Sequence, residues 1–275
     1  MSKLSLYAAL ALVILIPLLF VLGLRVQPQP FAPYLESTPE LEMVPLPDDL
    51  PMPVARYYRA IALGENNQIP VINSAVISTR GKMRVAGITF PTRFRFIHQA
   101  GKGYRHYAEA TLFGRPIMKI NERYLDGQAR MELPFGVIEN EPKIDMAANL
   151  GLWGESIWLP TIFISNPSVH WEAVDDTTAR LIVPFKEGED GFTVYFDPQT
   201  GLIEHLESMR YKNAADNEKT LWINEVRDWD EFHGLLVPSP AAATWADEGV
   251  PWLIVTLDDV VYNADVTDYI RVKGY

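Results

Sequence analysis

The sequence of 275 residues contains no cysteine. This absence excludes disulfides, thiolate zinc sites, iron–sulfur clusters and cysteine nucleophiles. It leaves the compartment open, because a chain without thiols suits either redox environment. No Asn-x-Ser/Thr sequon with x other than proline occurs, so an acceptor for N-linked glycans is lacking as well.

Clusters of basic residues are also missing. Lys and Arg number 24 against 35 Asp and Glu, which gives a formal net charge of −11. Nucleic-acid binding requires Lys and Arg to replace the counterions of phosphate, so we expect no nucleic-acid partner. The same charge disfavours adsorption of the folded domain to anionic lipid headgroups.

Recognisable catalytic motifs are absent. No phosphate loop or dinucleotide fingerprint occurs. Residues 154–158 read Gly-Glu-Ser-Ile-Trp, but a nucleophile elbow needs a second glycine and a preceding strand, and this stretch falls in a helical pattern. The acidic residues around Gly188 are too few for a calcium loop and indicate a solvated hairpin tip.

The five histidines do not form a sequence motif for metal. None of them share the i, i+4 spacing of a helical metal pair. His98 and His106 can be neighbours across a hairpin at residues 101–103, but a third ligand is not visible, which favours cross-strand packing. We therefore predict no catalytic residue, no metal and no cofactor, and the sequence favours a non-catalytic role over an enzyme.

One long apolar run is present near the N-terminus. Residues 6–24 carry no charge, and about 19 helical residues span roughly 28 Å, close to the thickness of a hydrocarbon core. The alternatives are a cleaved signal peptide, which has a shorter apolar region and a small-x-small site, and a buried soluble helix, which is rarely apolar on all sides. We predict a transmembrane signal-anchor at residues 6–25.

The flanks of this run set the expected orientation. Lys3 precedes it and Arg25 ends it, and no further Lys or Arg follows until Arg56. The positive-inside rule then favours a short cytoplasmic N-terminus, residues 1–5, and an extracytoplasmic main domain. The predicted location is the bacterial inner membrane, with a single pass and contact with membrane lipid.

The rest of the chain divides into a linker and a domain. Residues 26–47 are rich in proline, which favours extended polyproline geometry and a semi-rigid stalk. Residues 48–275 form the predicted β-rich domain. It opens with a short amphipathic helix over residues 50–64, for which Gly64 suits the C-terminal end.

Two blocks of alternating polar and apolar residues follow, separated by a helix. The first block covers residues 71–133, with turn signals at 101–103, 114–116 and 126–127. The helix carries a stripe at Met146, Leu150, Trp153 and Ile157 and ends by Pro160. Strands of the second block are predicted at residues 179–185, 192–196, 202–211, 221–229, 241–245 and 252–262, with a hairpin turn at 189–191.

The predicted fold class is α+β and mostly β. One strongly curved antiparallel sheet, like half of a barrel, carries two helices packed on it, and the N-terminal transmembrane helix is additional. Asp258 and Asp259 fall inside a strand, which predicts an ion pair with Arg93 or Arg210, or a bulge. Five aromatic side chains either line an apolar cavity or partner surface or belong to an ordinary core: Trp153, Trp158, Phe163, Trp171 and Trp252.

Five short motifs occur in order along residues 48–262. They are Leu50-Pro51-x-Pro53-Val54-x-Arg56-Tyr57, Tyr124-Leu125-Asp126-Gly127, Glu155-x-x-Trp158-x-Pro160, Trp171-x-x-Val174-Asp175-Asp176 and Gly234-x-x-Val237-Pro238. Together they resemble an uncharacterised bacterial family of domain-of-unknown-function proteins, many of them membrane-anchored. The order of elements and the Asp197-Pro198-x-Thr200-Gly201-Leu202 turn also resemble the half-barrel fold of periplasmic lipoprotein carriers.

Three functions remain open at this stage. The first is a non-catalytic, membrane-tethered interaction or scaffold module, an accessory subunit that binds another membrane or envelope protein. The second is binding or local handling of a lipid or other lipophile in a half-barrel cavity, which requires a hollow sheet face. The third is an enzyme of unrecognised class, which requires clustered titratable groups in a cleft.

Overall fold

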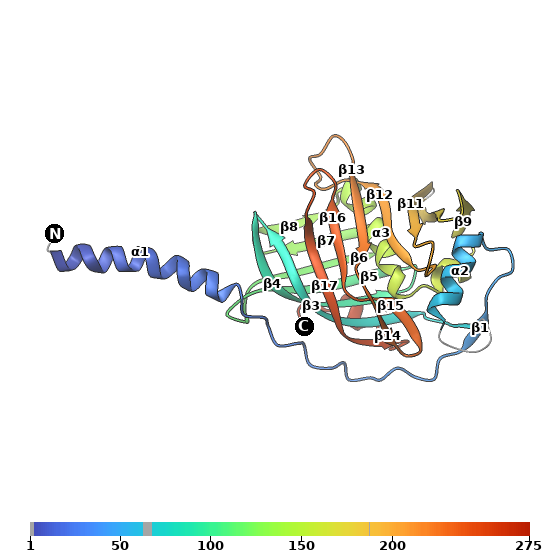
Figure 1. The fold of residues 1–275 in the computed structure, drawn as a ribbon, viewed down its shortest axis with the longest axis horizontal. Helices are drawn as coiled ribbons and strands as arrows, with labels where there is room; N and C mark the ends of the chain where they lie inside the picture. Colours follow the sequence, from blue (N-terminus) through green and yellow to red (C-terminus); the bar gives the residue numbers. More distant parts are fainter. Residues whose placement is uncertain (1–2, 63–67, 187) are drawn as a thin grey trace.

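The computed structural model describes residues 3–62, 68–186 and 188–275, without the side chains of residues 3–6 and 8–12. Within these ranges, one antiparallel sheet of 13 strands makes up the body of the protein (Figure 1). Its strands, in spatial order, are β8 (Gly136–Glu139), β7 (Gln128–Leu133), β6 (Arg115–Leu125), β5 (Gly103–Leu112), β4 (Ile88–Gln99), β3 (Ser74–Val85), β17 (Pro251–Tyr262), β16 (Ala241–Trp245), β13 (Thr220–Val226), β12 (Ile203–Arg210), β11 (Gly188–Phe196), β10 (Thr178–Phe185) and β9 (His170–Ala173).

Helices and two short hairpins complete the fold. The helical elements are α1 (Lys3–Gly23), α2 (Met52–Ile61), α3 (Pro142–Glu155), η1 (Ser156–Trp158), α4 (Ile162–Ser165) and η2 (Tyr269–Arg271). The short pairs are β1 (Met43–Pro45) with β2 (Gln68–Pro70), and β14 (Trp229–Phe232) with β15 (Leu235–Pro238). The prediction of a mostly-β domain with one large antiparallel sheet is confirmed, and the sheet is open, because β8 and β9 stand at opposite ends of the strand order.

The last long strand joins the two β blocks. Strand β17 pairs with β3 of the first block and with β16 of the second. The approach is closest at Gly81, where a Cβ would lie 1.8 Å from the carbonyl oxygen of Ile254. Glycine is therefore required at this position for the two strands to pair in this register.

The two adjacent aspartates of β17 create the predicted bulge. The pairing register with β3 shifts between Leu257 and Asp259. Asp258 forms its ion pair with Arg80, whose Nη2 lies 2.7 Å from Oδ1. The prediction of Arg93 or Arg210 as partner was wrong, because the bulge directs Asp258 toward β3, where Arg80 is the adjacent basic residue.

The helix α3 packs on one face of the curved sheet (Figure 1). It contacts β6 and β7 of the first block and β10 and β12 of the second. Its close approach to β13 depends on Gly154, where a Cβ would lie 2.9 Å from Nδ2 of Asn224. The helices predicted at 50–64 and before Pro160 are both present as α2 and α3, although Gly64 lies outside the described residues.

The hairpin predicted at residues 189–191 turns earlier. Glu189, Asp190 and Gly191 are paired in β11 with residues of β10. Asp190 is 9% exposed and accepts a hydrogen bond from Nδ2 of Asn149 on α3, so it is not at a solvated tip. Glu187, the third acidic residue of that prediction, lies outside the described residues.

The proline-rich segment 26–47 lies along the domain. Phe31 is buried and stacks on Tyr275, with ring centroids 4.3 Å apart. Further on, the backbone N–H of Tyr262 donates to Oγ1 of Thr38, and β1 pairs with β2. This segment therefore contacts the domain instead of standing clear of it as a stalk.

The N-terminal segment is helical from Lys3 to Gly23. Among the residues that the structure describes, none of the helices combines the length and the apolar character that a membrane crossing needs. The predicted transmembrane segment at residues 6–25 is thus not supported by the structure. Arg25, predicted as a membrane flank, is exposed, and the side chain of Lys3 is not described.

Several motifs that are far apart in the sequence meet in the fold. Nε1 of Trp158 donates to the carbonyl oxygen of Pro238 at 3.0 Å, and Nη2 of Arg56 donates to the carbonyl oxygen of Asp176 at 3.0 Å. Each of these bonds joins two different motifs. The motifs therefore contact one another through the packing of α2, η1, β15 and the second β block.

Candidate functional site

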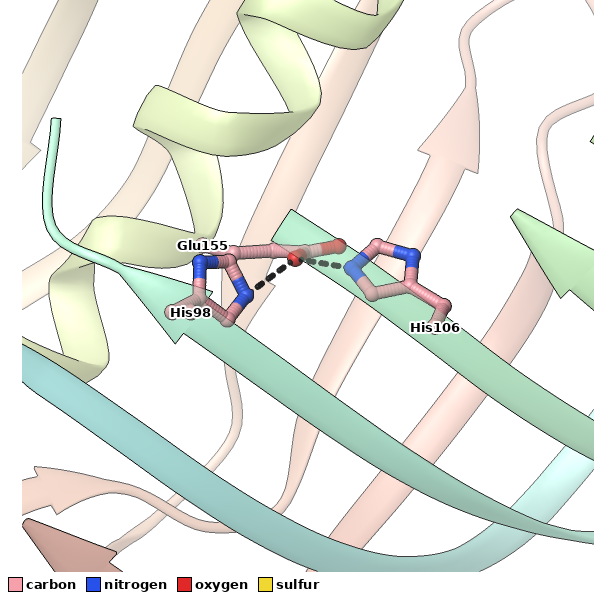
Figure 2. A group of neighbouring side chains, drawn as sticks. All are labelled: His98, His106 and Glu155. Atoms are coloured by element: carbon pink, nitrogen blue, oxygen red, sulfur yellow. Dashed lines mark hydrogen bonds and ion pairs between the residues drawn. The ribbon is translucent and has the colours of Figure 1, made fainter. Parts of the chain in front are cut away.

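A carboxylate and two imidazoles meet where α3 ends against the sheet (Figure 2). Glu155 is the last residue of α3, and its Oε2 accepts hydrogen bonds from Nε2 of His98 at 2.9 Å and from Nε2 of His106 at 2.8 Å. His98 lies on β4 and His106 on the adjacent β5. We refer to these three residues as the His–His–Glu cluster.

The register of β4 and β5 places both histidines on one face. His98 pairs with Tyr104, and His106 pairs with Phe96. Because side chains alternate along a strand and directly paired residues share a face, these four side chains point to the same side of the sheet. The imidazole centroids of His98 and His106 are 5.8 Å apart, so one carboxylate can reach both.

Burial and mutual charge determine the protonation of the cluster. Burial by itself would raise the pKa of Glu155, but the charges and hydrogen bonds of His106 and His98 hold that pKa at about 2. Burial lowers the pKa of His98 and outweighs its bond to Glu155. Burial also opposes the charge on His106, but the attraction of Glu155 and Glu122 prevails and raises its pKa. His106 is therefore the imidazole that gains a proton more readily.

A second layer of polar groups supports His106. Tyr104 stacks on its ring at 4.1 Å between centroids and donates its hydroxyl to Oε1 of Glu122. Oε2 of Glu122 lies 3.9 Å from Nδ1 of His106. The imidazole thus has a hydrogen-bonded carboxylate at Nε2 and a second carboxylate near Nδ1.

One arginine stands near these carboxylates without a close ion pair among the described residues. Arg210 on β12 lies over the ring of Trp222 at 4.2 Å, and its Nε is buried without a hydrogen-bond partner in that same part of the chain. Burial lowers the pKa of Arg210, while the charges of Tyr104, Glu122 and Glu155 oppose that effect.

The cluster borders a cavity of about 180 Å³ between α3, η1 and the sheet. The apolar lining side chains include Phe94, Phe96, Ala108, Ile120, Trp158 and Val255. Half-buried side chains complete the wall on another side: Met131, Leu133, Trp252 and Leu253. The polar lining groups are Tyr104, His106, Glu122, Glu155, Arg210, Asn224 and Glu225. The cavity is thus mostly apolar, with a group of buried and half-buried polar side chains that includes two members of the cluster.

The five aromatic residues predicted for a cavity or partner surface separate into two groups. Trp158 and Trp252 line the cavity. Trp153, Phe163 and Trp171 pack on one another away from it, with Phe163 6.1 Å from Trp171 between ring centroids. The second group belongs to the hydrophobic core beside the second β block.

Sequence reasoning missed Glu155 as a partner of the histidines. The hairpin signal at residues 101–103 predicted that His98 and His106 are neighbours, and the structure has them so. The third group comes from a helix 49 residues beyond His106, and no local pattern connects a helix end to a particular strand pair. The sequence does single out Glu155, in the Glu155-x-x-Trp158-x-Pro160 motif. That motif supports the family resemblance but does not indicate a partner or a chemical role for Glu155.

The serine next to Glu155 does not join the site. Oγ of Ser156 is fully buried and donates to the carbonyl oxygen of Leu152 at 2.8 Å. This is a helix-internal bond, so the Gly-Glu-Ser-Ile-Trp stretch is not a nucleophile elbow. In chemical terms, the His–His–Glu cluster offers two imidazole nitrogens and one carboxylate within 4.8 Å of one another, a donor set that can hold a divalent metal ion.

A family model with the description "Family of unknown function (DUF6544)" matches residues 41–257. The chain belongs to this family. The match covers the five motifs and all members of the cluster, and it confirms the predicted membership of an uncharacterised family. A search of curated proteins found no match.

Solved structures with a loosely similar arrangement exist. A LolA superfamily protein from Nitrosomonas europaea has 10% identity and a TM-score of 0.46, over 73% of this chain and 90% of that one. A DUF1329 family protein from Desulfovibrio piger has 11% identity and a TM-score of 0.43, over 80% and 96%. A putative outer membrane lipoprotein-sorting protein domain from Vibrio parahaemolyticus has 10% identity and a TM-score of 0.41, over 72% and 88%.

Proposed function

We propose that this DUF6544 domain binds a small apolar or amphipathic molecule in the cavity beneath α3. The observation that carries the proposal is the cavity itself, with apolar walls and a group of buried and half-buried polar side chains. A solid core in this place would have removed the lipophile function considered from the sequence. Packed protein interiors contain few voids larger than a water molecule, so a cavity of this size requires an explanation.

The volume limits what the cavity can enclose. An apolar cavity of roughly 150 Å³ binds a benzene-sized molecule, whereas pockets for drug-sized ligands measure about 300–1,000 Å³. At about 180 Å³, the cavity encloses one ring or a short acyl segment. A longer molecule would have to extend past the half-buried side chains on the wall, such as Met131 and Trp252.

The polar side chains favour an amphipathic ligand over a pure hydrocarbon. Arg210 has a buried Nε without a hydrogen-bond partner among the residues described, and it lines the cavity with Glu122 and Asn224. A buried polar group without a partner costs free energy, so a ligand with a polar head that accepts from Arg210 gains from being placed there. The apolar part of the ligand would then contact Phe96 and Trp158.

Binding of an environment-sensitive apolar dye tests the proposal. Ala108 lies on the cavity wall, paired with Phe94 and Ile120, so Ala108→Phe fills part of the space. We expect dye affinity to fall by at least about tenfold, which corresponds to roughly 1.4 kcal/mol. Ala173→Phe, the same substitution at an exposed position on β9, is the matched control and keeps the wild-type affinity.

Circular dichroism and thermal unfolding check that both variants are folded, since overpacking costs about 1–3 kcal/mol. Equal dye affinity in wild-type protein and a folded Ala108→Phe variant would contradict the proposal. The scaffold function predicted first has no observation in its favour among the residues described.

We also propose that the N-terminal segment holds the domain at the bacterial inner membrane. The support is the sequence: residues 6–24 are uncharged, between Lys3 and Arg25. Extraction of cell membranes with alkaline carbonate tests this placement. The full chain should stay in the membrane pellet, and a variant lacking residues 1–25 should not; release of the full chain would contradict it.

A further inference from the structure

The geometry points to a binding site for one divalent transition-metal ion of the Zn²⁺ class at His98, His106 and Glu155. This site borders the cavity proposed to bind an apolar molecule, but neither proposal depends on the other.

The donor atoms converge on one point. Both Nε2 atoms are directed at the same carboxylate oxygen of Glu155 (Figure 2), and the three ligand atoms lie within 4.8 Å of one another. Two imidazoles and one carboxylate are a known set for zinc with one position left open. In a tetrahedral site with bonds near 2.1 Å, ligand atoms are about 3.4 Å apart, so the separations of 2.8 and 2.9 Å need to widen by roughly half an ångström. The two Nε2 atoms, which lie within 4.8 Å of each other, must reach the same spacing.

Each donor is held by a different element. His98 and His106 lie on paired central strands, and Glu155 ends a helix that packs on the same sheet face. Side chains fixed in this way need little ordering before an ion binds. The cluster therefore offers a site that exists before the metal arrives.

Support from outside the donor set is present at His106. Nδ1 of His106 lies 3.9 Å from Oε2 of Glu122, which itself accepts a hydrogen bond from Tyr104. Metal-bound histidines characteristically direct their second nitrogen to a carboxylate, which fixes the ring and strengthens its basicity. Glu122 is thus a positioning residue for the ion.

His98 supplies a second, independent observation. Its side chain is fully buried, and its Nδ1 has no hydrogen-bond partner within the described part of the chain. One bond to Glu155 is then the polar contact that offsets burial of the whole imidazole. A metal ion bound at Nε2 would take the place of this hydrogen bond, while Nδ1 would remain without a partner in the described part of the chain.

Charge favours a cation here. Glu155 and Glu122 bring two carboxylates to within 4 Å of His106, and Arg210 is the basic side chain that lines the same cavity. His106 and Glu155 line the cavity, whereas His98 lies behind them, so the open position of the ion faces the cavity. That position could take a polar group of a cavity ligand, a consequence that rests on the proposed function.

Metal uptake by the full chain tests the inference. Protein purified in mild detergent is stripped with a chelator, dialysed and titrated with Zn²⁺ in a calorimeter, without any apolar ligand. We expect about one Zn²⁺ per chain. His98→Ala and His106→Ala should weaken binding by at least about 100-fold, and Glu122→Gln by about tenfold, the range found for outer-shell carboxylates.

His205→Ala is the matched control. His205 lies on β12 with Glu207 at 3.6 Å, so it has a carboxylate neighbour but lies outside the cluster. It should keep the wild-type affinity. Zn²⁺ binding that is unchanged in the His98→Ala and His106→Ala variants, or equally weakened by His205→Ala, would overturn the inference.

A measurement on the wild-type protein alone tests the metal site even if the variants do not fold. Stripped wild-type protein loaded with Co²⁺ should show the intense visible absorption of a four-coordinate ion with nitrogen and oxygen ligands, and Zn²⁺ should abolish it. Absence of that spectrum, or of stoichiometric Zn²⁺ uptake, would overturn the metal site. Dye binding by the stripped protein is scored separately, so failure of the cavity proposal is distinguishable from failure of the metal site.

Discussion

At the scale of single residues, Glu155 connects the two parts of the site. It accepts from both histidines, and its side chain is 22% exposed, toward the cavity. The sequence predicted the approach of His98 to His106, because a hairpin is a local structure. It could not predict Glu155, because the packing of a helix end on a strand pair depends on the whole sheet.

Removal of this carboxylate should destabilise the protein. Glu155→Ala leaves two buried imidazoles without their shared acceptor, and an unsatisfied buried polar group costs about 1–3 kcal/mol. We expect a loss of about 2 kcal/mol in the free energy of unfolding, measured by urea denaturation of chelator-treated protein. Glu204→Ala, at an exposed position on β12, should change stability by less than about 0.5 kcal/mol. Equal stabilities of the two variants would contradict the account of the cluster.

At the scale of elements, the prediction succeeded where patterns are local and failed where partners are distant. The meander of the first block and the strands β16 and β17 were predicted from alternation and turn residues. The turn after β10 was misplaced because Gly188 and Gly191 both suit a turn, and the pairing of Pro184 with Glu189 decides between them. The prediction of a stalk for residues 26–47 followed from composition, whereas the contacts of this segment are with distant residues, such as Tyr275 against Phe31 and Arg95 against Ala32.

The junction of β3 and β17 should be sensitive to a single methyl group. Gly81→Ala places a Cβ against the carbonyl oxygen of Ile254, and backbone cannot move aside as a flexible side chain can. We expect a loss of about 2–3 kcal/mol in the free energy of unfolding. Gly188→Ala is the control, because its Cβ would lie 3.7 Å from the nearest atom, an ordinary contact. A neutral Gly81→Ala variant would show that the two blocks do not join in this register.

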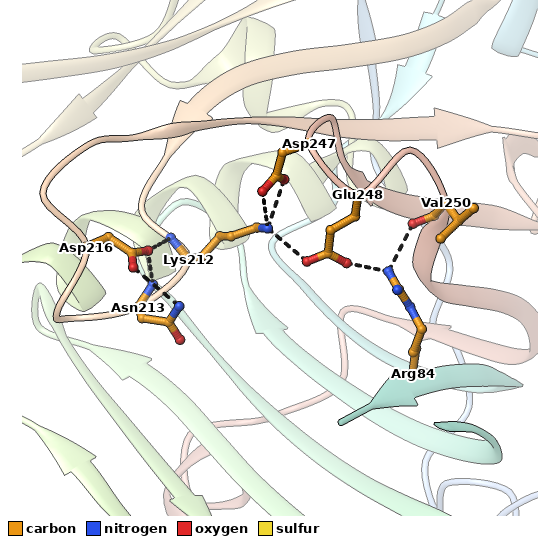
Figure 3. A network of polar contacts seen from close by, with 7 residues as sticks. All are labelled: Arg84, Lys212, Asn213, Asp216, Asp247, Glu248 and Val250. Atoms are coloured by element: carbon orange, nitrogen blue, oxygen red, sulfur yellow. Dashed lines mark hydrogen bonds and ion pairs between the residues drawn. The ribbon is translucent and has the colours of Figure 1, made fainter. Parts of the chain in front are cut away.

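A polar network ties two loops of the second block to each other and to β3 of the first block (Figure 3). Lys212, in the loop after β12, lies 2.8 Å from both Asp247 and Glu248, and Glu248 also pairs with Arg84 at the end of β3. The hydrogen bond from Lys212 lowers the pKa of Glu248; burial opposes it, but the charges of Lys212 and Arg84 act in the same direction as the hydrogen bond, and the pKa is lowered. A carboxyl whose pKa is lower in the folded state stabilises the fold above its unfolded pKa, and this contribution is lost as the pH falls through the folded value.

Glu248→Gln should therefore have an effect that depends on pH. At neutral pH we expect a loss of about 0.5 kcal/mol, because the network is at the surface and screened by solvent. The difference from the wild-type protein should shrink as the pH falls and Glu248 becomes protonated. Thermal unfolding across the acidic range measures this, with Glu231→Gln, an exposed residue of β14, as control. A difference that is constant with pH would mean that the charge of Glu248 does not stabilise the loops.

At the scale of the whole molecule, the open sheet leaves a space that its helices do not fill. Helix α3 covers part of the sheet face and approaches β13 closely at Gly154. The cavity lies next to this contact, and Gly154 and Trp158 both line it. The sequence raised the question of a hollow or filled sheet face but could not answer it. A cavity of about 180 Å³ is small compared with the total volume of the side chains packed between sheet and helices, and the sequence does not determine such a difference. Two of the five predicted aromatics line the space, and the other three complete the core.

The most direct test of the cavity is a crystal of the protein soaked with a small brominated aromatic amphiphile. Anomalous scattering then locates the bromine atom independently of any assumption about the ligand. The account predicts a bromine peak in the cavity, in contact with Phe96, Ala108 or Trp158. Bromine found at the protein surface alone, with the cavity closed by side chains, would contradict the central claim.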